Sequence, residues 1–264
     1  MVNIELLHDK ELKNFSNLSY SGKIYQYLIL YFIKKFKTII CVSKNTKKIL
    51  TKFLDVNDKN IFKIYNTLND TFYKVSLKEK NFFLKKNNLS FSFFLHVGAN
   101  VWYKNKINLI KIFFEIIKIT RRKNFKLVLI SNSFSNDLKS LIKELNLEKK
   151  IFLFKNVKLK DLRCFYSSAE ALILPSIREG FGWPIIEAQK CLCPVFTINK
   201  SPMNELGLDS VFYLDSKNPK KSALLIDRLL KKKKSLIKKG KKNVNRFNSN
   251  IFFKEMSIVY NRYL

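Results

Sequence analysis

An alternation of apolar runs and helical patterns constrains the fold of this chain more than any other feature. Short apolar runs are typical of buried strands, and apolar residues spaced by three or four are typical of helices. The longer of two series predicts strands at 93–97, 126–130, 151–154, 171–174, 195–197 and 211–213. Helices are predicted at 106–120, 136–146, 159–167, 184–191 and 219–236. Such alternation implies a parallel sheet with helical crossovers, so this series predicts a complete α/β domain of Rossmann-like topology.

A shorter series of the same kind precedes it. Strands are predicted at 4–7, 38–42 and 61–65, with helices at 23–36 and 44–54 between them. Residues 66–80 are polar and are interpreted as a connector, and a last helix is predicted at 249–262. Three strands leave open sheet edges, so this part is expected to be an incomplete domain.

Composition excludes several classes of protein. A hydrophobic content of 47% with 14% aromatic residues argues against wholesale disorder. The longest uncharged apolar run near the start, residues 24–33, is ten residues long, whereas a bilayer-spanning helix needs about 20. Residues 1–9 lack the basic start and apolar run of a signal peptide. Four cysteines without a regular framework indicate a reducing compartment, and two histidines are too few for an expected zinc site.

The charge is strongly positive, at +31 from 51 Lys and Arg against 20 Asp and Glu. Such a surface attracts phosphates and anionic lipid head groups. Two lysine clusters, 231–234 and 238–242, lie on a predicted helix and at its end. They are interpreted first as a solvated helix face and second as a membrane-surface contact. Specific nucleic-acid binding ranks third, because only seven basic residues are arginine.

Residues 175–188 carry the clearest chemical signal. The pattern predicts a strand, a loop and then a helix that opens near Pro184, because proline suits the first helical position. Gly180 and Gly182 lack a Cβ, so a ligand could approach their backbone N–H groups. The helix N-terminus would favour a phosphate, and the carboxylates of Glu179 and Glu187 would accept hydrogen bonds from a vicinal diol. The alternative is a turn with an acid that serves only the helix dipole.

This stretch resembles the donor-site motif of the retaining GT-B glycosyltransferases of family 4. In that family a Glu, Gly-Phe-Gly, a Pro and a second Glu follow at this spacing. Other segments resemble the family in the same order along the chain, namely 40–46, 63–66, 96–106, 193–195 and 202–206. The resemblance extends from about residue 4 to residue 260. It implies a GT-B-like α/β fold with a complete C-terminal Rossmann-like domain and a partial N-terminal one.

The resemblance also implies a metal-independent reaction without a cofactor. The family moves a sugar from a nucleotide diphosphate to an acceptor with retention at the anomeric carbon. Positive side chains and backbone amides must then neutralise the leaving diphosphate. Lys104, beyond the turn at Gly98, matches the diphosphate-binding lysine, and an ordinary solvated lysine is the alternative. Where the family often has an arginine this chain has Ala99, and Lys106 is expected to substitute as a less rigid point charge.

Further site residues follow from the same resemblance. Glu179 matches the acid that contacts the donor sugar, and Glu187 matches the acid that binds the ribose. Phe181 and Gly182 would present backbone N–H groups to the sugar and phosphates. Val157 lies in a loop that would border the nucleobase. His8 matches a histidine that faces the donor sugar, although a surface histidine beside an aspartate is the alternative. His96 is expected to be a core or edge residue of its strand.

Three domains are expected: a partial acceptor-side domain at 1–75, a donor domain at 76–247, and a helix at 248–264 that packs back on the first. Either the chain is a remnant or a partner chain supplies the missing N-terminal half. Family glycines are replaced by Thr67, Ser131 and Leu192, and Asn156 replaces one near Val157. A left-handed backbone would be strained at Thr or Leu.

Together these features predict a glycosyltransferase that uses a UDP- or GDP-linked sugar. Its acceptor would be a saccharide or a lipid-linked saccharide in cell-surface polysaccharide or lipopolysaccharide synthesis. A cytoplasmic location is expected, with peripheral contact to an anionic membrane. The alternative functions are an inactive nucleotide-binding remnant, one subunit of a split glycosyltransferase, or a basic membrane-surface protein that binds no nucleotide.

Overall fold

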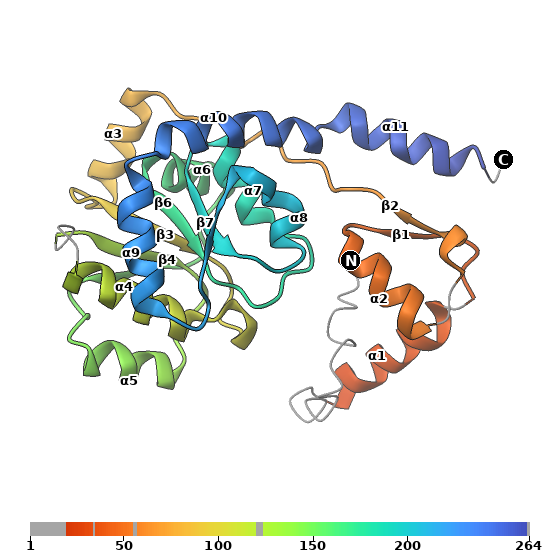
Figure 1. The fold of residues 1–264 in the computed structure, drawn as a ribbon, viewed down its shortest axis with the longest axis horizontal. Coiled ribbons are helices and arrows are strands. Elements are labelled where there is room, and N and C mark those ends of the chain that lie inside the picture. The colour runs from red at the N-terminus through yellow and green to blue at the C-terminus, as the bar shows by residue number, and fades with distance from the viewer. Residues whose placement is uncertain (1–19, 34, 55–56, 120–123, 263–264) are drawn as a thin grey trace. The chain divides into compact units, whose positions relative to one another are not determined.

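The computed structural model describes residues 20–262 apart from 34, 55–56 and 120–123, and it divides into two compact units (Figure 1). The first unit contains the described residues up to Thr67, the short segment Glu179–Phe181, and the chain from Phe247 onward. The second contains Leu68–Arg178 and Gly182–Arg246. The predicted strand at 4–7 and His8 lie outside the described residues.

The first unit is built around a pair of parallel strands. Strand β1 (Ile39–Cys41) pairs with β2 (Ile61–Lys63), with Ile39 opposite Ile61. Helices α1 (Tyr20–Ile33), α2 (Lys44–Leu54) and α11 (Ser249–Tyr260) belong to this unit. The hydroxyl of Ser43 caps α2 by accepting a hydrogen bond from the Thr46 N–H at 3.1 Å. A small core joins α1, α2 and the strands, formed by Ile33, Cys41, Ile49, Leu50 and Ile61.

The second unit has the six-stranded parallel sheet that the sequence predicts. Its strands are β3 (Phe93–Val97), β4 (Lys126–Ile130), β5 (Ile151–Phe154), β6 (Ala171–Leu174), β7 (Val195–Ile198) and β8 (Phe212–Leu214). They lie in the order β5-β4-β3-β6-β7-β8, with every neighbouring pair parallel. Strands β6 and β7 are buried from end to end, as expected for a sheet covered on both faces.

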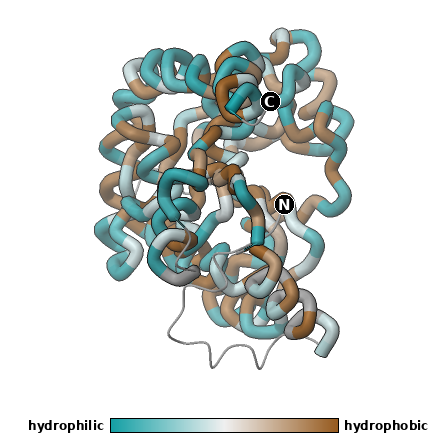
Figure 2. Tube along the Cα trace, turned by 90° about the vertical axis from the view of Figure 1, so that its right-hand side faces the viewer, coloured by the Kyte–Doolittle hydropathy of each residue, from teal (hydrophilic) through white to brown (hydrophobic). Residues whose placement is uncertain are grey.

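Helices cover both faces of this sheet (Figure 1). The helices of the unit are α3 (Leu77–Lys86), α4 (Lys106–Ile119), α5 (Asn136–Glu144), α6 (Leu159–Ser168), α7 (Trp183–Lys190), α8 (Met203–Gly207), α9 (Pro219–Leu230) and α10 (Lys233–Asn243). Helix α4 packs against α5 and α9, whereas α6 packs against α3 and α7. Within single helices the chain alternates between hydrophobic and hydrophilic residues (Figure 2), as helices with one face on a core require.

The strand order reverses between β3 and β6. From β3 the chain winds outward through β4 to β5, and it then returns to β6 and winds the other way to β8. The loops that follow β3 and β6 therefore diverge at the carboxyl edge of the sheet. Ligands of doubly wound α/β domains bind in the crevice at such a switch point. Both motifs singled out in the sequence, at 96–106 and 175–188, follow these two strands.

Two sequence predictions are wrong. The expected connector 66–80 contains the start of α3, where the hydroxyl of Ser76 accepts a hydrogen bond from the Glu79 N–H at 3.1 Å and caps the helix. The expected single helix at 219–236 is two helices, because α9 ends at Leu230 and α10 begins at Lys233. The break falls in a run of four lysines, whose like charges disfavour a continuous helix.

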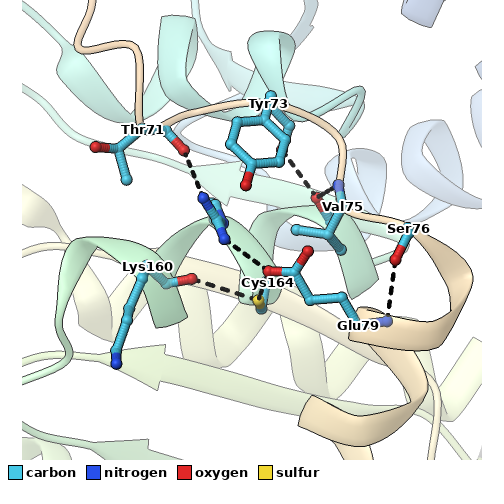
Figure 3. A network of polar contacts seen from close by, with 9 residues as sticks. Thr71, Tyr73, Val75, Ser76, Glu79, Lys160 and Cys164 are labelled. Atoms are coloured by element: carbon cyan, nitrogen blue, oxygen red, sulfur yellow. Dashed lines mark hydrogen bonds and ion pairs between the residues drawn. The ribbon is translucent and has the colours of Figure 1, made fainter.

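Thr71, Tyr73 and Glu79 lie together beside α6 (Figure 3), and all three contact Arg163 of that helix. The Nη2 of Arg163 donates to Glu79 Oε1 at 2.7 Å, and its guanidinium lies 4.2 Å from the centroid of the Tyr73 ring. The Lys74 ammonium also donates to the backbone oxygen of Ser167 at 2.6 Å. These contacts explain why residues 68–75 group with the second unit, although the sequence analysis placed them in the first domain.

Candidate active site

The loops after β3 and β6 are tied directly to each other. The Ile177 N–H donates to the Tyr103 carbonyl at 2.7 Å, and the side-chain amide of Asn105 donates to the Pro175 carbonyl at 3.2 Å. Asn105 has a φ of 54°, a left-handed conformation that asparagine tolerates, and it ends the short turn before α4. The two motif-bearing loops therefore form one supported structure at the switch point.

The side chain of Lys104 lies directly over Gly98. A Cβ on Gly98 would stand 2.9 Å from Lys104 Cδ and 3.0 Å from Cε, which is closer than carbon atoms approach without displacement. The Gly98 N–H donates to the Ile130 carbonyl of the neighbouring strand at 3.0 Å, so its backbone is fixed. The absence of a side chain at Gly98 therefore makes room for Lys104 beside the carboxyl end of β3.

Lys106 has a different environment from Lys104. Its side chain is buried at the start of α4, and its ammonium donates to the hydroxyl of Ser131 at 2.5 Å, beyond the end of β4. Burial, followed by the charge of Lys104, lowers the pKa of Lys106 from 10.5 to about 8. Its amine therefore already has a protein partner, which links the loops after β3 and β4.

Helix α7 begins as the sequence predicts. Gly182 precedes it with a φ of 104°, a conformation that residues with a side chain rarely adopt, and Pro184 stands in the first turn. A Cβ on Gly182 would lie 3.5 Å from Leu206, so this position is closely packed. Gly180 differs, because no atom lies within 4 Å of where its Cβ would be.

Glu187, one turn into α7, has two electrostatic partners in the second unit. Its Oε2 accepts a hydrogen bond from the hydroxyl of Tyr166 at 2.8 Å. Burial raises the pKa of Glu187 from 4.5 to about 7, while the Tyr166 hydrogen bond and the positive charge of Lys104 act in the opposite direction. Tyr166 is fully buried on α6, and burial raises its pKa well above 10, so it remains the donor. The positive charge of Lys104 thus acts on the carboxylate of Glu187.

Glu179, Gly180 and Phe181 group with the first unit. Glu179 is buried. The ring of Phe181 lies 6.0 Å from that of Phe247 and 6.3 Å from that of Tyr65, measured between centroids. Tyr65 and Phe247 are themselves 5.4 Å apart, so the three rings form an aromatic cluster within the first unit. The side chain of Phe181 therefore serves packing, while its backbone belongs to the motif loop.

The remaining predicted residues lie farther along the sheet or outside the described part of the chain. Val157 follows β5, which is two strands away from β3. Its neighbour Asn156 and the more distant Leu192 have φ values of 50° and 59°, so both glycine replacements do adopt the left-handed backbone. His8 falls among the residues that the structure does not describe. Among those it does describe, no three His, Cys, Asp or Glu side chains group as metal ligands.

His96 is a core residue of β3, as the sequence analysis expected. It is fully buried, and its Nδ1 lies 2.9 Å from the Ile173 carbonyl of the adjacent strand. A carbonyl only accepts, so Nδ1 carries the proton. Burial lowers the pKa of His96 from 6.5 to about 3, which keeps the ring neutral.

Sequence reasoning missed three residues around these loops. Tyr166 has no motif around it, and only the packing of α6 on α7 brings its hydroxyl to Glu187. The guanidinium of Arg178 lies 5.3 Å from the ring centroid of Trp102, so the two loops also meet through a cation–π contact. The position of Arg178, one residue before Glu179, was the only signal that could have drawn attention to it.

A fold of this class with these loops is that of the GT-B glycosyltransferases, and the comparisons with known proteins agree. Residues 78–246, more than half of the chain, match the family described as Glycosyl transferases group 1. The chain therefore belongs to this family of enzymes.

Two curated relatives are named for bacterial surface polysaccharides. The O-antigen chain mannosyltransferase RfbU of Salmonella typhimurium is 28% identical over 205 residues, which is 76% of this chain and 54% of the relative. The capsular polysaccharide biosynthesis glycosyltransferase CapM of Staphylococcus aureus is 28% identical over 262 residues, which is 92% of this chain and 67% of the relative. The chain spans about half the length of RfbU and of an archaeal glycosyltransferase that it also matches.

Solved structures share the fold. A glycosyltransferase from Rickettsia africae matches with a TM-score of 0.77 at 22% identity, over 93% of this chain and 67% of that one. Anabaena HepE, solved with UDP and glucose, matches with a TM-score of 0.79 at 16% identity, over 93% of this chain and 68% of that one. At these identities the likeness shows the fold alone, and it confirms the expected α/β, GT-B-like class.

Proposed function

We propose that this chain is the donor-binding part of a glycosyltransferase that uses a UDP- or GDP-linked sugar. The sugar would pass, with retention of anomeric configuration, to a saccharide or lipid-linked acceptor in cell-surface polysaccharide or lipopolysaccharide synthesis in the cytoplasm. The observation that carries this proposal is the position of Lys104 and Glu187 in the segments that follow β3 and β6, at the switch point of the sheet, where the charge of Lys104 acts to lower the pKa of Glu187. The relatives named for O-antigen and capsular polysaccharide support the pathway class.

The proposed roles follow from charge and hydrogen-bonding capacity. The ammonium of Lys104 offsets the negative charge of the leaving diphosphate, and Glu187 accepts hydrogen bonds from the ribose hydroxyls. Lys106, bound to Ser131, supports the phosphate loop and adds positive charge behind Lys104. Val157 borders the nucleobase.

The reacting end of the donor involves the motif loop. The backbone N–H groups of Gly180, Phe181 and Gly182 face the sugar and phosphates, while Glu179 stabilises the positive anomeric centre. His8 hydrogen-bonds the sugar. In the transfer the bond from the anomeric carbon to the diphosphate oxygen breaks, the acceptor oxygen bonds that carbon, and the acceptor proton leaves with the diphosphate. Lysine side chains and backbone N–H groups neutralise the leaving diphosphate in this proposal. We therefore expect no metal requirement and full transfer in the presence of EDTA.

Nucleotide binding tests the donor half. Purified protein is titrated with UDP, GDP and ADP and its thermal unfolding is followed, for the wild type, Glu187→Ala and Lys104→Ala. A nucleotide present at ~100 times its dissociation constant should stabilise the fold by ~2.7 kcal/mol. Lys190→Ala, an exposed lysine on the same helix as Glu187, is the matched control and should behave as the wild type.

Stabilisation by one nucleotide that both site variants abolish supports the proposal and identifies the base. Absence of any stabilisation in a folded sample contradicts it.

A turnover assay distinguishes sugar transfer from nucleotide binding alone. UDP- and GDP-sugars are incubated with the protein and lipid-linked acceptors, and release of the nucleoside diphosphate is measured. The same assay tests the second candidate, a nucleotide-binding remnant or one subunit of a split enzyme. Binding without turnover supports a remnant, and turnover restored by a polypeptide that supplies an N-terminal half supports a split enzyme.

A further inference from the structure

Helix α1 of the first unit exposes an unusually large apolar surface. Tyr20, Tyr27 and Tyr31 are 82%, 75% and 56% exposed. We call the exposed residues of this helix the tyrosine face, which comprises Tyr20, Ile24, Tyr27, Leu28, Tyr31 and Phe32. Single exposed apolar residues are ordinary, but a contiguous set of this size marks an interaction surface.

Helix geometry makes the tyrosine face continuous. At about 100° per residue, its six positions fall within an arc of about 140°. Ile33 falls on the opposite side of the helix and is buried in the small core against Cys41 and Leu50. Helix α1 is therefore apolar on two sides. One side is covered by its own unit, and within the described structure the other faces solvent.

The sequence on both sides of this helix carries charges of one sign. Between Leu12 and Leu54 the sequence has nine lysines and no Asp or Glu. Lys35 and Lys37, just beyond the helix end, are exposed. The Lys35 ammonium donates to the Tyr31 hydroxyl at 3.2 Å and lies 4.4 Å from the centroid of that ring. Cations thus lie at the border of the apolar surface, with their stems along it.

We propose that the tyrosine face of α1 docks on the surface of an anionic lipid bilayer. Tyrosine rings with polar hydroxyls favour the zone between lipid head groups and acyl chains, and flanking lysines bind anionic head groups. The sequence from Leu12 to Leu54 contains no acid, and an anionic membrane matches such a basic segment by charge alone.

The helix would lie in the plane of the membrane and would not cross it. Its 14 residues extend about 21 Å, which is shorter than the roughly 30 Å hydrocarbon core. In the described part of the chain, no helix is long and apolar enough to span a bilayer. The proposal does not depend on nucleotide binding, and it would bring the enzyme to lipid-linked acceptors.

The lysines of α10 are the main competing basic surface, and two of them are already paired. Lys233 contacts Glu170 at 3.0 Å and Lys239 contacts Asp209 at 2.9 Å. Helix α1 exposes six large apolar side chains, more than any other described helix, and α10 exposes none, so α1 should contribute more to membrane binding than α10.

Vesicle co-sedimentation tests the proposal. Binding is measured on vesicles of pure phosphatidylcholine and of equal parts phosphatidylcholine and phosphatidylglycerol, at low and high salt. The wild type should bind only the anionic vesicles, and less at high salt. Tyr27→Ser combined with Tyr31→Ser should lower the partition coefficient about tenfold. Leu77→Ser combined with Phe82→Ser, two exposed apolar residues of α3, is the matched control and should bind as the wild type.

A fluorescent variant reports the contact directly. The emission of Tyr27→Trp should shift to shorter wavelength with anionic vesicles, relative to the wild type, which has two tryptophans elsewhere. The proposal is overturned if the wild type does not bind anionic vesicles. It is also overturned if the double serine variant binds them as well as the wild type does. A change from dimer to monomer in that variant, without vesicle binding, also overturns it and identifies a second copy as the occupant.

Discussion

The β3–β6 switch point and helix α1 use the same kinds of residue in opposite ways. At the switch point each charged group has a defined neighbour: Glu187 accepts from Tyr166, and Lys106 donates to Ser131. Along α1 the aromatic rings are exposed, and so are Lys35 and Lys37 just beyond its end. In a chain this rich in lysine, the charge alone therefore says little about function. Burial and partners distinguish a site for a small anionic ligand from a surface for a large one.

The energetic consequences differ as well. A buried carboxylate is held at a cost to stability, which a ligand that uses it can offset. Exposed side chains, by contrast, contribute little to the free energy of unfolding of the protein alone. Substitution of the Glu187 carboxylate should therefore alter stability and nucleotide affinity together, whereas substitutions on α1 should alter neither.

The largest effect is expected for Glu187→Gln. The pKa of Glu187 is about 7 in the fold and 4.5 in the reference state, so the folded state binds more protons between these values and stability falls as pH rises through them. Above pH 7 the Glu187 carboxyl is ionised in both states, so the full cost of burying its charge lowers stability. The neutral amide of glutamine removes this cost. Glu187→Gln should therefore unfold at a higher temperature than the wild type at pH 8 while nucleotide affinity drops about 10- to 100-fold.

Calorimetric unfolding and nucleotide titration at pH 8 measure both quantities. Nearly equal stability at pH 4, below both pKa values, is the internal control. A variant that loses stability at pH 8 would show that Glu187 is structural.

A smaller effect is expected for Gly98→Ala. The new Cβ would collide with the flexible Lys104 side chain and not with backbone, so Lys104 should move while the fold remains. Nucleotide affinity should fall by up to about tenfold, with little change in the temperature of unfolding. If the effect acts through Lys104, then Gly98→Ala should cause no further loss of nucleotide affinity in a protein that already carries Lys104→Ala. An additive loss would mean that Gly98 acts by another route.

Tyr166→Phe should change pH dependence more than maximal affinity. Ribose binding uses the ionised form of Glu187, so affinity should fall as pH drops below about 7. Without the Tyr166 hydroxyl the pKa of Glu187 rises further, and this fall should begin at a higher pH. Titrations across pH 6 to 9 measure the midpoint. Tyr213→Phe, which removes a hydroxyl bonded to the Leu208 carbonyl, is the control and should leave the midpoint in place.

Elements decided by local pattern were predictable from the sequence. Phe93–Val97 and Ala171–Leu174 are short apolar runs, and both are strands with the expected bounds. Pro184 and Gly182 predicted the start of α7 because proline and glycine restrict the backbone in known ways. Leu192 and Asn156 adopt the left-handed backbone at positions where the family has glycine.

Features that depend on packing between distant residues were not predictable. Lys104 and Lys106 look alike in the sequence, and only the register of α4 against β4 places Lys106 on Ser131. The Tyr166–Glu187 hydrogen bond joins two helices that no motif connects. The missed start of α3 is different, because Ser76 and Glu79 form a recognisable capping pattern within residues interpreted as a connector.

The smallest effect is expected for the paired substitution Tyr27→Ser and Tyr31→Ser in solution. Both side chains are exposed, and serine and tyrosine have similar helix propensities, so the free energy of unfolding should change by less than about 0.5 kcal/mol. Nucleotide affinity should equal that of the wild type, because the switch point belongs to the other unit. Calorimetry and nucleotide titration without vesicles test this. A clear loss of stability would mean that the tyrosine face is covered within the protein itself, and the contrast between the two regions would disappear.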